Sequence, residues 1–134
     1  MALKLTLKPS EKFVINGAVV VNGDRRTSLV IQNRVTILRE KDILLPRDAT
    51  SPAKRIYLPI MMMYLEEDSK RSYYEEFVRR ITEFINAIAD REALETCVRI
   101  IECVHAKEYY KALMACRKLL PFEKDRLEYV APKL

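Results

Sequence analysis

The sequence predicts an α+β protein, in which a small N-terminal antiparallel β module, built as a sandwich or barrel, packs on a C-terminal helical bundle. Residues 3–45 alternate apolar with polar side chains or hold short apolar runs, which is typical of strands. The only two glycines of the chain both follow an asparagine, as Asn16-Gly17 and Asn22-Gly23, and Asn-Gly between apolar runs indicates a turn. From Ser51 onward the apolar spacing is that of amphipathic helices.

The first strand is expected over residues 3–7, where leucine alternates with lysine or threonine. A period of two places the leucines on one face of the strand and the lysines on the other. Residues 13–15 and 18–21 are apolar and flank Asn16-Gly17. This pattern predicts a hairpin with a two-residue turn.

The next strands are expected over residues 29–32 and 36–38, on either side of Asn33-Arg34. We predict a second hairpin here, from a weaker signal because the turn has no glycine. Residues 43–45 could add a short last strand before Pro46. The pattern leaves the strand order open.

The first helix is expected to begin at Ser51-Pro52, an N-cap followed by a proline at the first helical position. Pro59 lies within the apolar stripe of this helix and should kink or divide it, because proline cannot donate to the carbonyl of Arg55. The stripe follows the i, i+3, i+4 rule and consists of Ala53, Ile56, Tyr57, Ile60, Met61 and Tyr64.

Three further helices follow, joined by links short enough to favour antiparallel neighbours. The first could be capped by Ser72 with Glu75 as a capping box, or earlier by Asp68, and the second by Asp90. Pro121 should close the last one. The predicted apolar stripes are Tyr74, Phe77, Val78, Ile81, Phe84, Ile85 and Ile88, then Leu94, Cys97, Val98, Ile101 and Val104, then Tyr109, Tyr110, Leu113, Met114 and Leu120.

Length and composition predict one compact unit of 134 residues, with 49% hydrophobic and 32% charged residues. Within it we expect a basic β module over residues 1–50, a helical bundle over 51–123 and a loosely held tail over 124–134. The longest apolar run, residues 58–65, is too short to cross a bilayer, and the N-terminus shows no secretory signal. The three cysteines lie in helical pattern, which fits small buried residues of a reducing cytosol.

The positive charge belongs to the N-terminal part. Residues 1–55 hold eleven Lys or Arg against five Asp or Glu, an excess of six, whereas residues 56–134 hold thirteen against fourteen. A charge run is most often a solvated face, but this asymmetry also indicates a polyanionic partner, with nucleic acid the leading candidate. The candidate RNA-binding residues are Lys4, Lys8, Arg25, Arg26, Arg34, Arg39, Lys41, Lys54 and Arg55.

No pattern in the sequence predicts catalysis. The single histidine, His105, has no second histidine or metal-ligand spacing beside it, so its simplest role is structural. Serine nucleophile motifs, a P-loop and a GxGxxG motif are absent. Paired carboxylates such as Glu75-Glu76 fall on helical faces, where solvated charge explains them. We therefore expect no enzyme activity, no metal and no cofactor.

Two clusters leave alternatives open. Met61-Met62-Met63 could form an adaptable binding surface, although filling a gap between the β module and the helices is the simpler interpretation. The tyrosine pairs Tyr73-Tyr74 and Tyr109-Tyr110 each place one ring inward and one toward the surface. The outer rings could stack on RNA bases or anchor a protein interface, and packing at the edge of the core is the simpler interpretation.

Several segments resemble the flagellar-biosynthesis repressor FlbT family. They are LKLTLKPSEKFVINGAVVVNGDRRTSLVIQN, ILREKDIL, TSPAKRIYLPIMMMYL and, near the end, EYYKALMACRKLL. The resemblance covers nearly the whole chain. It implies a bacterial cytoplasmic protein that binds the 5′ untranslated region of flagellin messenger RNA, lowers its translation and promotes its decay, in opposition to the partner protein FlaF. The family has no motif that assigns RNA contacts to single residues, so the site above rests on charge and turn placement.

Together these observations predict a post-transcriptional repressor of flagellin synthesis whose basic β face contacts the leader RNA. The helical part would supply a homo-oligomer contact or a docking surface. The alternative is a protein-binding regulator or chaperone that acts on flagellin or FlaF and affects the message indirectly. The balanced charge of the helical part, the methionine triplet and the tyrosine pairs favour this alternative.

Overall fold

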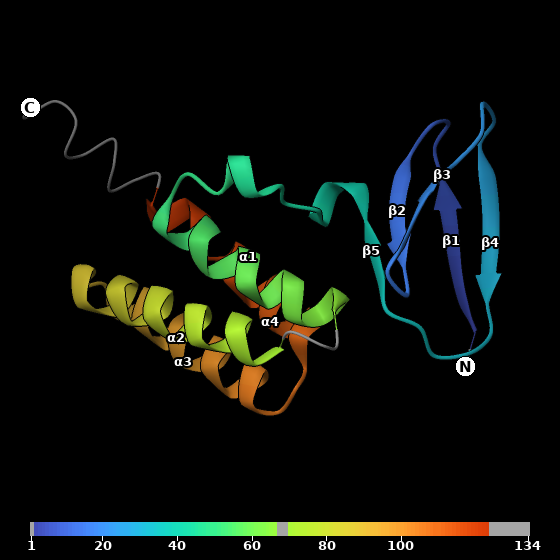
Figure 1. Cartoon of the computed structure of the whole chain (residues 1–134). Helices are drawn as coiled ribbons and strands as arrows, with labels where there is room; N and C mark the ends of the chain where they lie inside the picture. Colours follow the sequence, from blue (N-terminus) through green and yellow to red (C-terminus); the bar gives the residue numbers. More distant parts are fainter. Residues whose placement is uncertain (1, 67–69, 124–134) are drawn as a thin grey trace, which may run out of the picture. The chain divides into compact units, whose positions relative to one another are not determined.

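The computed structural model describes residues 2–66 and 70–123 (Figure 1). The chain forms two compact units that divide between Ile43 and Leu44. The first holds strands and the second holds helices, which confirms the predicted α+β class. The packing of the β module on the bundle stays a prediction. The predicted loose tail, residues 124–134, lies outside the described residues.

The β unit contains five described strands that form two small antiparallel sheets. One sheet pairs β1 with β4, and the other has the order β3-β2-β5. Both sheets are open, so the described residues do not form a closed barrel. The strands are β1 (Leu3–Leu7), β2 (Lys12–Ile15), β3 (Ala18–Val21), β4 (Thr27–Ile31) and β5 (Ile37–Arg39).

The hairpin at Asn16-Gly17 is confirmed. It joins β2 to β3, with Ile15 opposite Ala18. Asn16 and Gly17 both have positive φ, 49° and 82°, the conformation that a two-residue turn between twisted strands requires. The Asn16 side chain also accepts a hydrogen bond from the backbone N–H of Thr36 at 3.0 Å. The turn is therefore also held by the residue that precedes β5.

Two strand predictions are wrong. The segments around Asn33-Arg34 do not pair with each other, because β4 pairs with β1 and β5 pairs with β2. Residues 43–45 form no strand and lie between two 3₁₀ turns, η1 (Glu40–Asp42) and η2 (Pro46–Asp48). Asn33-Arg34 lacks the glycine that favours a tight hairpin, so longer-range pairing sets the topology. The leucine face of β1 is confirmed in part: Leu5 and Leu7 are buried, and Leu3 is exposed.

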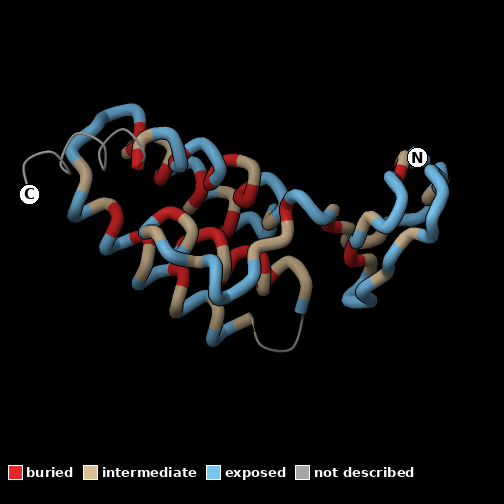
Figure 2. Tube along the Cα trace, turned by 90° about the horizontal axis from the view of Figure 1, so that it is seen from above, coloured by how far each residue is buried: buried red, intermediate tan, exposed pale blue. Residues whose placement is uncertain are grey.

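The helical unit is a bundle of four described helices. Helix α1 packs against α2 and α4, and α3 packs against α4. Figure 2 shows buried residues along the sides on which these helices face one another. No helix in the described part of the chain is long and apolar enough to cross a membrane. The helices are α1 (Pro52–Leu65), α2 (Lys70–Ala87), α3 (Arg91–His105) and α4 (Tyr109–Arg117).

The helix starts follow the capping signals in two cases of three. Ser51 caps α1 by accepting from the N–H of Lys54, and Asp90 caps α3 by accepting from the N–H of Ala93. The capping box at Ser72 is wrong, because Ser72 lies inside α2; the alternative cap, Asp68, lies outside the described residues. Pro59 does not divide α1, which runs through it.

The apolar stripes are corrected at several positions. The buried face of α3 consists of Ala93, Cys97, Ile100 and Val104, whereas Val98 is 55% exposed. Residues 120–123 are helical, so Pro121 does not end helical structure. Cys97 and Cys116 are buried as predicted, Cys103 is half-buried, and all three are free thiols. The buried face of the last segment consists of Ala112, Leu113, Ala115, Cys116 and Leu119.

Candidate nucleic-acid interface

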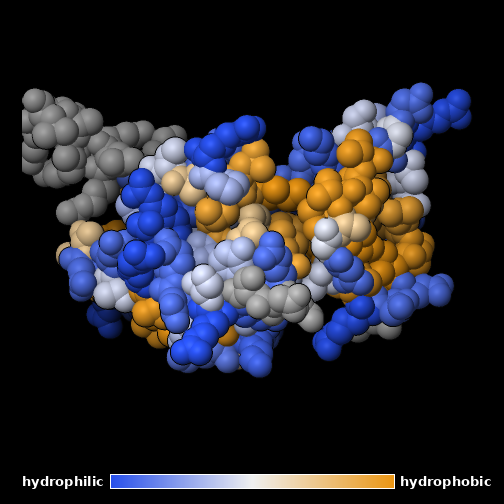
Figure 3. Space-filling view, viewed as in Figure 1, coloured by the Kyte–Doolittle hydropathy of each residue, from blue (hydrophilic) through white to orange (hydrophobic). Residues whose placement is uncertain are grey.

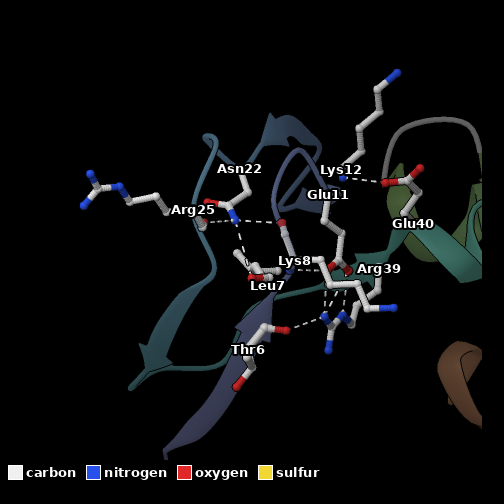
Figure 4. Close-up of polar contacts among 9 residues, drawn as sticks. All are labelled: Thr6, Leu7, Lys8, Glu11, Lys12, Asn22, Arg25, Arg39 and Glu40. Carbon is white, nitrogen blue, oxygen red and sulfur yellow. Dashed lines mark hydrogen bonds and ion pairs between the residues drawn. The ribbon is translucent and has the colours of Figure 1, made fainter.

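The turn between β1 and β2 is built around an ion pair. Arg39, at the end of β5, lies 2.9 Å from the Glu11 carboxylate (Nη2 to Oε2) and donates to the carbonyl of Thr6 at 2.6 Å (Figure 4). Glu11 also accepts from the backbone N–H of Lys8 at 2.9 Å. A charge-assisted fork of this kind fixes geometry as well as adding energy. It therefore holds Lys8 at a defined place on the surface.

A second anchor is the side chain of Asn22. Its amide donates to the carbonyl of Lys8 at 2.7 Å and to the carbonyl of Arg25 at 2.9 Å. The backbone N–H of Ser10 donates to the carbonyl of Gly23 at 2.9 Å. These bonds join the turn before β2 to the loop after β3. The loop that carries Arg25 and the turn that carries Lys8 are thus tied together, although they are distant in sequence.

The surface beside the ion pair is hollowed. A hollow of about 600 Å³ is lined by residues of the β unit, Lys8, Pro9, Ser10, Glu11, Arg39, Glu40 and Lys41. Lys8 and Lys41 contribute exposed ammonium groups to it. In Figure 4 the Arg25 side chain extends away from this cluster, so its guanidinium is open to an approaching ligand.

Most predicted cations of the β unit are free to bind an anion. Six of them are exposed, and no ion pair in the described part of the chain involves them. In the helical unit, by contrast, several arginines pair with glutamates three or four residues away on the same helix. Unpaired cations keep their full charge for a polyanion. The six are Lys4, Lys8, Arg25, Arg26, Arg34 and Lys41.

The remaining three candidates differ from these six. The Arg39 guanidinium is engaged by Glu11 and Thr6, so it positions the turn. Lys54 and Arg55 lie in the first turn of α1, in the helical unit, where Lys54 is half-buried and Arg55 is exposed. The structure therefore gathers Lys8, Arg39 and Lys41 around one hollow of the β unit, whereas Lys54 and Arg55 belong to the other compact unit.

Sequence reasoning missed the two residues that organise this surface. Glu11 and Asn22 carry no net positive charge, and a search for cations passes over them. For Asn22 a signal was present, because asparagine before a turn often bonds to nearby backbone groups. For Glu11 the sequence offered no such signal, because its partner Arg39 is distant in sequence.

Nothing in the described residues forms a metal site: no group of three His, Cys, Asp or Glu side chains lies together. His105 is exposed, and its Nε2 lies 3.0 Å from the hydroxyl of Tyr74. Each tyrosine pair has one half-buried ring, Tyr73 or Tyr109, and one exposed ring. The prediction is wrong for Tyr74, which was placed in the apolar stripe and is 37% exposed. Two residues of the methionine triplet, Met61 and Met63, are buried, which disfavours an exposed methionine surface.

The Glu11 pair predicts a dependence of stability on acid. The Lys8 N–H and the Arg39 guanidinium hold the pKa of Glu11 below its ordinary value of 4.5. The ionised form therefore stabilises the folded state above about pH 4.5, and this contribution is lost as the pH falls through the lowered value. Glu11→Gln should lower the melting temperature more at pH 7 than at pH 3. Calorimetry at both pH values measures this, with Asp24→Asn as the control; an equal shift at both would contradict it.

Comparison with known proteins agrees with the resemblance of the sequence. The family model described as flagellar protein FlbT matches residues 3–127. The flagellum biosynthesis repressor protein FlbT of Caulobacter vibrioides is 53% identical over 98% of this chain and 93% of its own length. A probable flagellum biosynthesis repressor FlbT of Caulobacter sp. is 54% identical over 98% and 100%, and one of Rhodopseudomonas palustris is 40% identical over 95% and 98%. No solved structure matches the chain.

Proposed function

This chain belongs to the FlbT family of flagellar proteins, and we propose that it is a cytoplasmic repressor of flagellum biosynthesis that acts on flagellin messenger RNA. The basic surface of the β unit binds the 5′ untranslated region of the message, which blocks translation and exposes the message to nucleases. The repressor role is supported by the relatives named as flagellum biosynthesis repressors. The role requires no catalytic group and no cofactor.

One observation carries the RNA-binding part of the proposal: exposed, unpaired cations of the β unit on a scaffold held by Glu11 and Asn22. Arginines in the loop after β3 can clamp phosphates or stack on unpaired bases, both of which occur in RNA loops. A preformed scaffold reduces the entropy lost on binding. Lys8 and Lys41 beside the hollow would add further phosphate contacts.

The test is an RNA-binding titration at several salt concentrations with a flagellin leader RNA and a scrambled RNA of equal length. Arg25→Glu combined with Arg26→Glu should weaken leader binding by at least about tenfold, because each hydrogen-bonded phosphate contact contributes on the order of 1 kcal/mol. If both arginines contact phosphates, the slope of log K against log salt should fall in magnitude by about 1.4, at about 0.7 per phosphate on single strands.

The matched control is Arg71→Glu combined with Arg91→Glu, which makes the same change in net charge on exposed helical arginines. This variant should keep the wild-type salt slope. If the Arg25 and Arg26 variant binds the leader like the wild type, the site lies elsewhere. If the wild type does not distinguish the leader from the scrambled RNA, direct leader recognition is wrong.

A second candidate function rests on the helical unit, which exposes apolar side chains of α2, α3 and α4, including Val78, Val98 and Tyr110. Such side chains fit a docking surface for flagellin or FlaF, with an indirect effect on the message. The same titration with flagellin monomer and with FlaF distinguishes the two. Tight protein binding that Val78→Lys and Val98→Lys abolish, together with weak and unselective RNA binding, would favour this second function.

A further inference from the structure

The edge of strand β3 is open and apolar. Strand β3 is the outer strand of the sheet β3-β2-β5 and pairs only with β2 in the described part of the chain. Its sequence is Ala-Val-Val-Val, and the side chains of Val19 and Val21 are 72% and 55% exposed. Figure 3 shows apolar surface gathered over the β unit on the face in view.

Proteins usually protect edge strands with lysine, proline, a bulge or an inward-pointing charge, because an open edge pairs with other strands. Of the other edge strands, β1 contains Lys4 and β5 contains Arg39. Strand β4 carries no charge and has only the polar pair Thr27-Ser28. Strand β3 has no polar residue. Its open edge is therefore available to pair with another strand.

The hydrogen-bond register shows which backbone groups are available. The N–H of Asn22 donates to the carbonyl of Glu11 at 2.9 Å, and every second residue of an antiparallel strand directs its backbone groups to the same side. Ala18 and Val20 therefore bond to β2. The N–H and C=O groups of Val19 and Val21 point to the open edge.

We propose that β3 of this chain pairs antiparallel with β3 of a second copy, centred on Val20, to join the two three-stranded sheets into one. In this register Val19 lies opposite Val21 of the second copy, and the reverse pair follows by two-fold symmetry. These are the residues whose backbone groups point outward, so each pair exchanges both hydrogen bonds. The four valines then form one cross-strand patch on the same face.

Charge favours a second copy over an acidic peptide as the occupant. The strand itself carries no charge, so an acidic peptide would find no cation along it. Antiparallel pairing places Arg25-Arg26 of one copy beside the Asn16-Gly17 turn of the other, and that turn is uncharged. The two arginine loops then lie at opposite ends of the joined strands and do not repel each other at close range.

The strand is also held in place before it pairs. The hairpin turn fixes one end of β3, and the Asn22 side chain, bonded to Lys8 and Arg25, fixes the other. Little conformational freedom is lost on pairing. However, four residues make a small interface compared with the roughly 1,200 Å² of a stable complex. We expect a weak dimer, with a dissociation constant on the order of 10 μM to 1 mM.

Sedimentation velocity of the full chain over this concentration range tests the proposal. The wild type should shift from monomer toward dimer. Val19→Lys with Val21→Lys should raise the dissociation constant at least about tenfold, because lysines on an edge oppose each other across the two-fold axis. Val30→Lys is the matched control, a valine of β4 that is 59% exposed, and should leave the dimer unchanged. A protein that stays monomeric throughout, or a dimer that the double variant retains, would overturn the proposal.

A cysteine pair tests the register in a Cys103→Ala background, which removes the half-buried native thiol. Val20→Cys places the two thiols directly opposite, at a Cα separation of about 4.5 Å, which suits a disulfide. Val19→Cys places them on a diagonal at about 7–8 Å, too far apart. Mild oxidation should therefore link the first variant and not the second on a non-reducing gel. Equal linking of both, or of neither, would exclude the register centred on Val20.

Discussion

Replacing Phe77 with alanine should lower the free energy of unfolding of the helical unit by about 3–5 kcal/mol. Phe77 lies on the buried face of α2 and is 1% exposed, and α2 packs extensively on α1. The loss combines the transfer free energy of the ring with the cost of the cavity it leaves. Urea unfolding followed by far-ultraviolet circular dichroism measures the effect.

The control is the next residue on the same helix. Val78 is 40% exposed, so Val78→Ala should cost less than about 1 kcal/mol. A loss for Phe77→Ala no larger than that of the control would mean that α2 packs through a different face. If the slope of the unfolding free energy against urea concentration changed without a change in midpoint, the compactness of the unfolded or native state would have altered instead.

Local signals in the sequence predicted local structure well. Asn16-Gly17, Ser51-Pro52 and Asp90 each act through bonds within a few residues, and each forms the turn or cap expected from its chemistry. Such features need no knowledge of the rest of the fold. The apolar stripe of α2 was predictable in part, because Phe77, Ile81 and Phe84 repeat at helical spacing and are buried. Tyr74 and Val78 were predicted in the same stripe and are exposed.

The strand pairing could not be predicted, because any two apolar segments satisfy the same alternation. Adjacent segments around Asn33-Arg34 favoured a hairpin, yet β4 lies on β1 and β5 on β2. The predicted stripe of α3 included Ile101, whereas Ile100 is the buried residue, and the reason is related. Both are apolar and adjacent, and the buried face also includes Ala93, a small residue that the predicted stripe of larger side chains left out.

The candidate site was predictable in composition and not in geometry. Charge counting identified the cations of the β unit, since an excess of charge is visible in any window of the sequence. It could not separate Arg39, which is engaged by Glu11, from Arg25 and Arg26, which are exposed. That distinction depends on a pairing between β1, β5 and the turn that joins β1 to β2, and only the folded chain brings these segments together.

The second large effect is expected at Glu123, where Glu123→Ala should cost about 1.5–3 kcal/mol. The Glu123 carboxylate is buried and accepts from the backbone N–H of Ala53 at 2.7 Å, at the start of α1. The first amides of a helix have no partner within it and attract negative charge. Alanine would leave the Ala53 amide buried without an acceptor. Thermal or urea unfolding measures the loss.

Two further variants separate the hydrogen bond from the charge. Glu123→Gln keeps an oxygen that can accept from the Ala53 amide but removes the charge that the helix start favours, so its loss should be intermediate. Glu102→Ala removes an exposed carboxylate of α3 and should cost within about 0.5 kcal/mol. If Glu123→Ala matched this control, the buried contact would contribute nothing. A loss for Glu123→Ala that clearly exceeds the control would mean that residue 123 and the start of α1 stabilise each other. The bundle would then depend on a contact between its first and last described turns.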